Sequence, residues 1–120
     1  MTRPVLAESE YRFMDLIWDH EPVSSTQLVT LCGEAFGWKK STTYTEIKRL
    51  SQKGYLQNQD AVVTATVSRE EVQAHASELF VKQTFGGSLP CFLAAFLGNK
   101  PISRKEAAEL RNLIDQREEE

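Results

Sequence analysis

The sequence predicts a mainly α-helical fold with one small β-hairpin, divided into a domain over residues 1–67 and a helical domain over residues 68–120. Three observations support this prediction. Apolar residues recur at three- and four-residue spacing along most of the chain, as they do on the buried face of a helix. The spacing changes to two only near residues 55–67, where it indicates strands. Beyond residue 68, further helical stretches hold four of the six phenylalanines.

The N-terminal domain begins with two predicted helices. The stretch "LAESEYRFMDLIWDH" places five apolar residues on one helix face: Leu6, Phe13, Met14, Ile17 and Trp18. The second helix follows Pro22, with Ser24 or Ser25 as its N-cap, and Gly37 ends it. Its apolar face comprises Leu28, Leu31, Cys32, Ala35 and Phe36.

A third helix is predicted from about Lys40 to Lys53, because Thr43, Ile47 and Leu50 share one face. Gly54 follows, at the position where helices commonly end in a left-handed residue. Two strands, at about residues 55–58 and 62–67, then flank a polar turn at Gln59-Asp60. Three helices, the last two joined by a tight glycine-containing turn, followed by a hairpin predict a winged helix-turn-helix.

Residues 68–120 predict three more helices, with N-caps at Ser68 and Ser103 and a break at Gly86-Gly87. The inward stripe of the first comprises Val72, Ala76, Leu79, Phe80 and Gln83. The second is apolar on more than one face, through Leu89, Phe92, Leu93, Phe96 and Leu97. The last turns inward Ala107, Leu110, Leu113 and Ile114.

This C-terminal domain holds more apolar side chains than so small a unit can bury by itself. We therefore expect a second copy of the chain to cover them, so that residues 68–120 form the dimerisation domain of a homodimer. The alternative is that these helices only cover the first domain. The residues expected at the dimer contact are Leu79, Phe80, Leu89, Phe92, Leu93, Phe96, Leu110 and Ile114.

Charge is distributed unevenly along the chain. The whole sequence has 14 Lys and Arg against 17 Asp and Glu. The segment from residue 37 to residue 56, however, sets five cations against one acid, Glu46; the cations are Lys39, Lys40, Lys48, Arg49 and Lys53. Binding to DNA depends on the cations that face the phosphates and not on the net charge. This segment is therefore the candidate DNA-binding surface.

In a helix-turn-helix, the N-terminal half of the second helix enters the major groove. Lys, Ser and Thr side chains can read base edges there, and cations at the start of a helix suit phosphate oxygens. The predicted DNA contacts are Lys39, Lys40, Ser41, Thr42, Tyr44, Thr45 and Lys48. One alternative is that this helix face is merely solvated. The other is a winged-helix module that binds a protein partner, an alternative that the net negative charge of the whole chain favours.

Other functions have little support in the sequence. No nucleophile–base pair, catalytic carboxylate pair or phosphate loop predicts an enzyme, and no cofactor is expected. Cys32 and Cys91 lack a second Cys or a His at ligand spacing, so no metal is expected. Both fall in apolar helical patterns and predict buried, reduced thiols. No apolar run approaches the ~20 residues of a membrane span, and no signal peptide is apparent, so we expect no membrane insertion and a cytoplasmic protein.

Several segments also carry a family resemblance: "ESEYRFMDLIW", "EPVSSTQL", "WKKSTTYTEIKRLSQKGYL", "VSREE", "FGGSL" and "ISRKEAAELRNLI". In this order they resemble the BlaI/MecI/CopY family of bacterial winged-helix repressors, from Leu6 to about Asp115. The resemblance implies a homodimer that binds a palindromic operator and blocks transcription, with a membrane sensor-protease as a further partner. It matches the recognition helix to Lys40, Ser41, Thr42, Tyr44, Thr45 and Lys48, and the dimerisation domain to residues 68–120.

Four features depart from the family pattern. The tail "IDQREEE" lacks the Cys-x-Cys pair of copper-responsive members. Members that are inactivated by proteolysis have Asn before the cut Phe, whereas the aligned bond here is Ala95–Phe96. The wing "QNQDAVV" carries Asp60 in place of the family's cations, so we expect a weaker wing contact with the DNA backbone. Glu46 stands at a usually apolar position, and predicts either a pair with Arg49 or Lys53 or altered packing of its helix.

Overall fold

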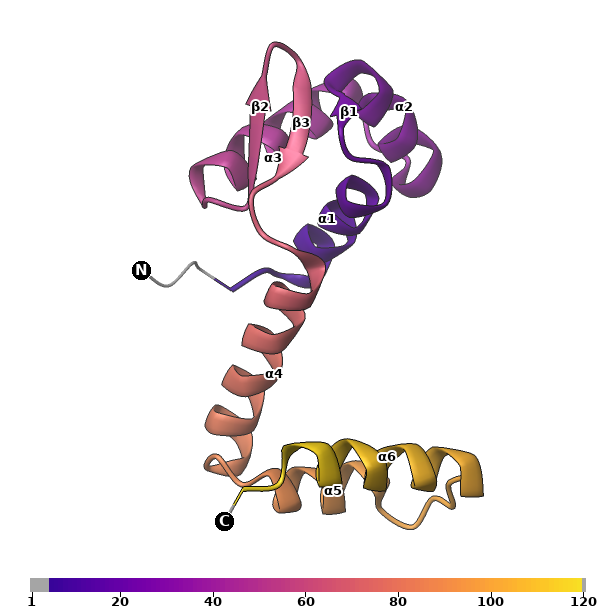
Figure 1. Cartoon of the computed structure of the whole chain (residues 1–120). Helices are drawn as coiled ribbons and strands as arrows, with labels where there is room; N and C mark the ends of the chain where they lie inside the picture. Colours follow the sequence, from indigo (N-terminus) through magenta and orange to yellow (C-terminus); the bar gives the residue numbers. More distant parts are fainter. Residues whose placement is uncertain (1–4, 120) are drawn as a thin grey trace. The chain divides into compact units, whose positions relative to one another are not determined.

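The computed structural model describes residues 5–119 (Figure 1). The chain forms two compact units, the first ending at Glu78 and the second beginning at Leu79. The elements are α1 (Glu8–His20), β1 (Val23–Ser24), α2 (Ser25–Phe36), α3 (Lys40–Gln52), β2 (Leu56–Gln59), β3 (Val62–Ala65), α4 (Arg69–Phe85), α5 (Leu89–Leu97) and α6 (Arg104–Arg117). The predicted mainly α fold with a β-hairpin is confirmed. The predicted functional division at residue 67 stays a prediction.

Local signals define the ends of the helices in the first unit. The Ser24 hydroxyl accepts a hydrogen bond from the backbone N–H of Gln27 at 3.0 Å, which settles the N-cap of α2 in favour of Ser24. Gly37 ends the same helix in the left-handed conformation, with φ of 69°, where an L side chain would be strained. Because α2 ends at Gly37, only a short turn separates it from α3, which begins at Lys40.

The sheet is antiparallel with strand order β1-β3-β2, so the hairpin of β2 and β3 is extended by β1 on the β3 side. The hairpin turn consists of Asp60 and Ala61, with φ of 52° and 62°, as in a type I′ turn. The predicted turn at Gln59-Asp60 is wrong by one residue, because Gln59 pairs with Val62 in the ladder. The sequence did not predict β1, since two residues are too few to show a period.

The core of the first unit lies where α1, α2, α3 and the sheet meet. Its buried side chains are Phe13, Met14, Ile17, Val23, Leu28, Cys32, Ile47, Leu50, Tyr55, Leu56, Val63 and Val67. Four further side chains that were predicted to face inward are half-buried against it: Leu6, Trp18, Leu31 and Phe36. Ala35 is exposed, contrary to prediction, because it borders an open cavity at the end of α2.

The second unit is built around an aromatic cluster. Phe92 of α5 has its ring centroid 5.6 Å from that of Phe85, 6.1 Å from that of Phe80 and 5.7 Å from that of Phe96. The rings of Phe85 and Phe80 meet Phe92 edge-on, a favourable geometry for aromatic pairs. Even so, no described residue of α5 or α6 is fully buried.

Several inward-facing predictions are therefore wrong for the chain by itself. On α4, Ala76, Phe80 and Gln83 are exposed, whereas Val81 and Phe85 are half-buried. The more covered face of the C-terminal half of this helix is therefore not the predicted one. On α6, Leu113 and Ile114 are 50% and 56% exposed. Two short helices and half of α4 provide too little surface to cover one another.

Candidate nucleic-acid interface

All seven residues predicted to contact DNA lie on the exposed surface at or near the N-terminal half of α3. They are Lys39, Lys40, Ser41, Thr42, Tyr44, Thr45 and Lys48. The opposite face of α3 buries Thr43, Ile47 and Leu50 in the core, as predicted. An amphipathic helix with this division must present its polar residues to solvent, because rotating it would expose the apolar stripe.

The five cations of this segment divide into two groups. Glu10 of α1, which is only 2% exposed, lies 2.7 Å from the Lys53 ammonium and 3.5 Å from the Arg49 guanidinium. Arg49 also pairs with Glu46 at 3.1 Å, which answers the open question about Glu46. Arg49 and Lys53 therefore hold α3 against α1.

The remaining cations, Lys39, Lys40 and Lys48, form no ion pair with any residue that the structure describes. The Lys40 ammonium lies 5.9 Å from the centroid of the Tyr44 ring, one helical turn along. Thr45 donates its hydroxyl hydrogen to the Ser41 carbonyl at 2.9 Å. The exposed face thus combines three available cations with short polar side chains.

Glu10 is a functional residue that sequence reasoning missed. Burial alone raises the pKa of its carboxyl group. The hydrogen bonds from Lys53 and the Ala7 N–H, with the charges of Lys53 and Arg49, outweigh burial and leave the pKa below its ordinary value of 4.5. A signal was present, because Glu10 falls on the same helical face as Phe13, Met14 and Ile17. An acid within an apolar stripe predicts a buried ion pair.

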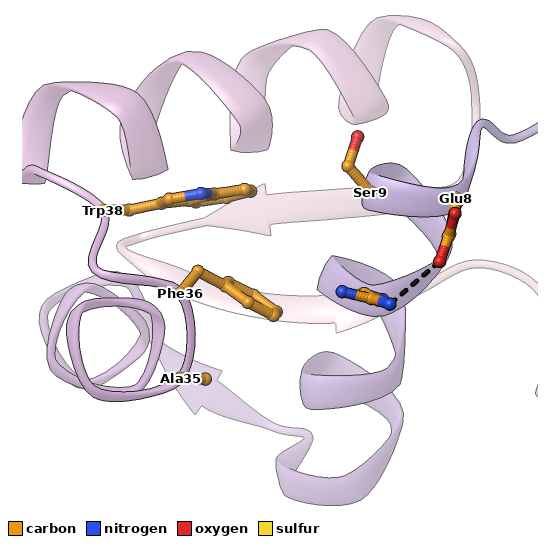
Figure 2. A pocket seen from close by; sticks show the side chains of 6 residues that line it. Glu8, Ser9, Ala35, Phe36 and Trp38 are labelled. Carbon is orange, nitrogen blue, oxygen red and sulfur yellow. Dashed lines mark hydrogen bonds and ion pairs between the residues drawn. The ribbon is translucent and has the colours of Figure 1, made fainter.

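The turn before α3 is anchored by aromatic packing (Figure 2). The Trp38 ring stacks on the buried Phe13 ring at 5.7 Å and lies 4.9 Å from the Phe36 ring. These side chains fix the residue that precedes Lys39, the N-cap of α3. An open cavity of about 620 Å³ lies beside them, lined by Glu8, Ser9, Arg12, Ala35, Phe36 and Trp38.

That cavity adds no available cation to the interface. Its one basic side chain, Arg12, is paired with Glu8 at 2.8 Å along α1. The wing adds none either, because Asp60 is the only charged residue between residues 56 and 65. The available cations therefore lie on α3 and its N-cap, and not on the hairpin.

The described part of the chain was expected to hold no metal site and to keep both thiols buried. Within residues 5–119, no group of three or more His, Cys, Asp or Glu side chains is placed to hold a metal ion. Burial raises the pKa of the Cys32 thiol, so Cys32 remains a protonated core side chain at neutral pH. The prediction of a buried thiol is wrong for Cys91, which is exposed on α5.

The helices of the described residues differ in length and in apolar content. No single helix among them is both long and apolar enough to cross a membrane. Taken together, α4 and α5 reach that length and composition, across a bend of 88°.

The sequence model of one protein family, Penicillinase repressor, matches residues 6–116. The chain belongs to the penicillinase repressor family. The family match confirms the predicted family and class, a DNA-binding repressor of transcription, and confirms that the protein is not an enzyme.

Individual relatives of this penicillinase repressor family member are distant but match over nearly their full length. The penicillinase repressor of Bacillus licheniformis is 23% identical over 117 residues, covering 94% of this chain and 91% of the relative. The methicillin resistance regulatory protein MecI of Staphylococcus aureus is 22% identical over 116 residues, covering 93% and 94%.

A solved structure supports the fold of the first unit. The solution structure of monomeric Bacillus licheniformis BlaI in complex with the blaP half-operator superposes with a TM-score of 0.50 at 22% identity. The match covers 58% of this chain and 90% of that one. At this level of identity the match establishes the winged-helix fold of the first unit, as predicted.

Proposed function

We propose that this penicillinase repressor family member is a homodimer that binds an inverted repeat in DNA, with α3 of each copy in the major groove. The observation that carries the proposal is the division of charge on α3. Arg49 and Lys53 are engaged by Glu10, whereas Lys39, Lys40 and Lys48 face solvent without an acidic partner among the described residues. Free cations beside Ser and Thr suit a helix that meets both phosphates and bases.

The individual roles follow from position along α3. Lys39 and Lys40 lie at the N-terminus of the helix, beside unpaired backbone N–H groups, and bind phosphate oxygens. Ser41, Thr42 and Lys48 project from the exposed face and contact base edges, where Lys favours guanine. Tyr44, which is 37% exposed, donates its hydroxyl hydrogen to a phosphate.

Dimerisation is assigned to the second unit. Its exposed apolar side chains include Phe80, Leu89, Phe96 and Ile114, which are 51%, 55%, 69% and 56% exposed in one chain. Side chains of this size are seldom left in water together, and a second copy would bury them. The remaining contact residues, Leu79, Phe92, Leu93 and Leu110, are half-buried in one chain.

The relative bound to DNA supports the stoichiometry. BlaI of Bacillus licheniformis is described as a monomeric form in complex with a half-operator. By analogy, one copy of this chain occupies one half-site, and two copies joined through residues 68–120 occupy a palindromic operator. Two-fold symmetry of the protein then matches two-fold symmetry of the site.

Induction by proteolysis would act at the Ala95–Phe96 bond. This bond lies in the last turn of α5, between two exposed residues. Cleavage there would remove Phe96 and α6 from the proposed dimer contact and weaken the dimer. The partner is then a membrane sensor-protease acting on a cytoplasmic repressor, and a gene for such a protease beside this one would support the assignment.

A titration of DNA tests the proposal. The protein is titrated against DNA duplexes from the region upstream of its own gene, in a gel-shift experiment at low and physiological salt. We expect retardation by a dimer and a steep loss of affinity as salt increases, because several phosphates are neutralised. Absence of retardation at low salt, or equal affinity for every upstream segment and for random DNA, contradicts it.

A further inference from the structure

We propose that Arg69 is a positioning residue: it fixes the direction in which α4 leaves the winged-helix unit, and so sets the half-site spacing that the dimer accepts. This inference rests on the proposed function. Arg69 is the first residue of α4, which follows the hairpin (Figure 1). Its side chain reaches back more than fifty positions along the sequence to Asp15 of α1.

The guanidinium group is held on several sides. Its Nε donates to Asp15 Oδ1 at 3.1 Å, and its Nη2 donates to Asp19 Oδ1 at 2.6 Å and to the Asp15 carbonyl at 3.3 Å. The guanidinium carbon also lies 5.4 Å from the centroid of the Trp18 ring. A planar fork bound along its edges and covered by a ring cannot rotate without losing several contacts at once.

The same face of α1 holds the chain at two further points. The Trp18 indole N–H donates to the Val67 carbonyl at 3.0 Å, and Gln73 donates to the Tyr11 hydroxyl at 3.0 Å. Arg69 and Gln73 are one helical turn apart on α4. Contacts at two successive turns define the direction of a helix, whereas a contact at one turn leaves it free to pivot.

The N-cap of α4 cannot perform this role. Ser68 accepts a hydrogen bond from the Glu71 N–H at 3.0 Å, which decides where the helix begins and leaves its direction open. The ion pairs of Arg69 are also partly exposed, with side-chain exposures of 32% for Arg69, 41% for Asp15 and 56% for Asp19. Pairs this exposed add little to stability, so their removal should alter direction without unfolding the unit.

Small changes in direction have large consequences at the DNA. α4 has 17 residues. A helix of that length measures about 25 Å, so a tilt of about 10° at its base displaces the far end by about 4 Å. One base-pair step measures about 3.4 Å along the duplex. Loss of the Arg69 contacts would therefore allow the dimer to accept half-site spacings that differ by about one base pair.

The test uses full-length protein and a series of inverted repeats whose spacers differ by single base pairs. The half-site is the one that the wild-type protein selects from a random duplex library, and the isolated half-site is measured in parallel. We expect the wild type to prefer one spacing, with about ten-fold or greater losses one base pair away, because mismatched geometry removes the gain from binding both half-sites. Arg69→Ala should bind the half-site as the wild type does, while its preference among spacings falls below about three-fold.

Three further variants separate position from charge and from folding. Asp19→Asn removes the shortest pair with no change in side-chain size and should flatten the profile in the same way. Arg69→Lys keeps the positive charge but lacks the two hydrogen-bonding edges of the guanidinium group. Its spacing profile should therefore lie between those of the wild type and Arg69→Ala. Arg12→Ala makes the same change in charge at another position, on α4's partner helix α1. It should leave the profile unchanged, because among residues 5–119 Arg12 pairs with Glu8 alone.

Each outcome decides between the two proposals. A wild-type spacing profile in both Arg69→Ala and Asp19→Asn overturns the role of Arg69. So does loss of half-site binding in both, because Arg69 would then support the DNA-binding surface itself. A wild type that binds all spacings equally well, but better than the half-site, overturns the inference alone. A wild type that binds no repeat better than the half-site counts against the dimeric function.

Discussion

The Glu10 carboxylate lies 2.7 Å from the Lys53 ammonium, so a buried acid in the first turn of α1 is joined to the C-cap of α3. Arg49, one turn earlier on α3, lies 3.5 Å from the same carboxylate. Two cations that look available in the sequence are thereby withdrawn from the exposed face. Their positions fix the C-terminal end of α3, while Trp38 fixes the turn before its N-terminal end.

Glu10→Gln tests the contribution of this buried charge. The amide oxygen can still accept the Ala7 N–H, but Lys53 and Arg49 lose their common partner. We expect the free energy of unfolding at pH 7 to fall by about 1–3 kcal/mol, because a buried charged contact is left incomplete. Urea denaturation of both proteins measures the difference, and Glu8→Gln, at an exposed pair with Arg12, should cost under about 0.5 kcal/mol.

The same pair predicts a dependence on pH. Because the pKa of Glu10 is lower in the folded state, its contribution is fully present above the ordinary value of 4.5 and is lost as the pH falls through the lowered pKa. The difference between wild type and Glu10→Gln should therefore shrink below about pH 4. A difference that stays constant from pH 7 to the acid limit of the folded state would show that the ionised pair is not its source.

The exposed face of α3 predicts two classes of DNA mutant. Thr42→Ala and Lys48→Ala should weaken binding to the selected inverted repeat by about 1–3 kcal/mol more than binding to random DNA, because they remove base contacts. Lys39→Ala should weaken both alike and reduce the salt slope by about one. Arg12→Ala is the control for loss of a cation outside α3, since Arg12 lies on α1 and pairs with Glu8. Equal losses on both DNAs for all three α3 positions would contradict these roles.

The hairpin turn predicts a stabilising substitution. Ala61 adopts φ of 62°, a conformation that costs an L residue about 1–2 kcal/mol, whereas glycine adopts it freely. After the greater flexibility of glycine in the unfolded chain is deducted, Ala61→Gly should raise the free energy of unfolding by about 0.5–1 kcal/mol. Ala65→Gly, the same change in regular strand β3, should lower it. Thermal unfolding distinguishes them, and destabilisation by both would show that Ala61 is not strained.

Alanine substitutions at two phenylalanines of the second unit should affect dimerisation and stability differently. Phe96 is 69% exposed, so Phe96→Ala should leave the single chain intact and weaken the proposed dimer, which should then dissociate at higher protein concentration than the wild type. Phe92 contacts three other rings, so Phe92→Ala should also lower stability, by up to about 3–5 kcal/mol. Sedimentation velocity from micromolar to nanomolar protein measures the first effect. A Phe96→Ala protein that remains dimeric at nanomolar concentration would remove Phe96 from the dimer contact.

Local signals in the sequence were sufficient to predict most of the helices. The spacing of Phe13, Ile17 and Leu28, the caps at Ser24 and Ser103, and the glycines that end α2 and α4 all act within a few residues of the chain. The exposed side of α3 followed for the same reason, because burial of Thr43, Ile47 and Leu50 leaves only one way to orient the helix.

Features that depend on partners distant in the sequence were not predictable in this way. Glu10 meets Lys53 across 43 positions, and Arg69 meets Asp15 across 54, and no local pattern specifies either pair. The two-residue strand β1 exists only because β3 lies beside it. The exposure of Leu113, which was predicted only to face inward, was also missed, because a sequence records that a side chain is apolar but not whether enough neighbouring surface exists to cover it.

The sequence by itself determined the order of the helices, the hairpin and the polar face of α3, since periodicity and capping operate over one or two helical turns. Only the tertiary structure decided which cations on α3 remain available, because that depends on an acid of α1 that folding brings beneath the helix. It likewise decided how α4 begins, through contacts between Arg69 and two acids more than forty residues away. Electrostatic pairing is set by distance in space, and the chain reveals that distance only when it is folded.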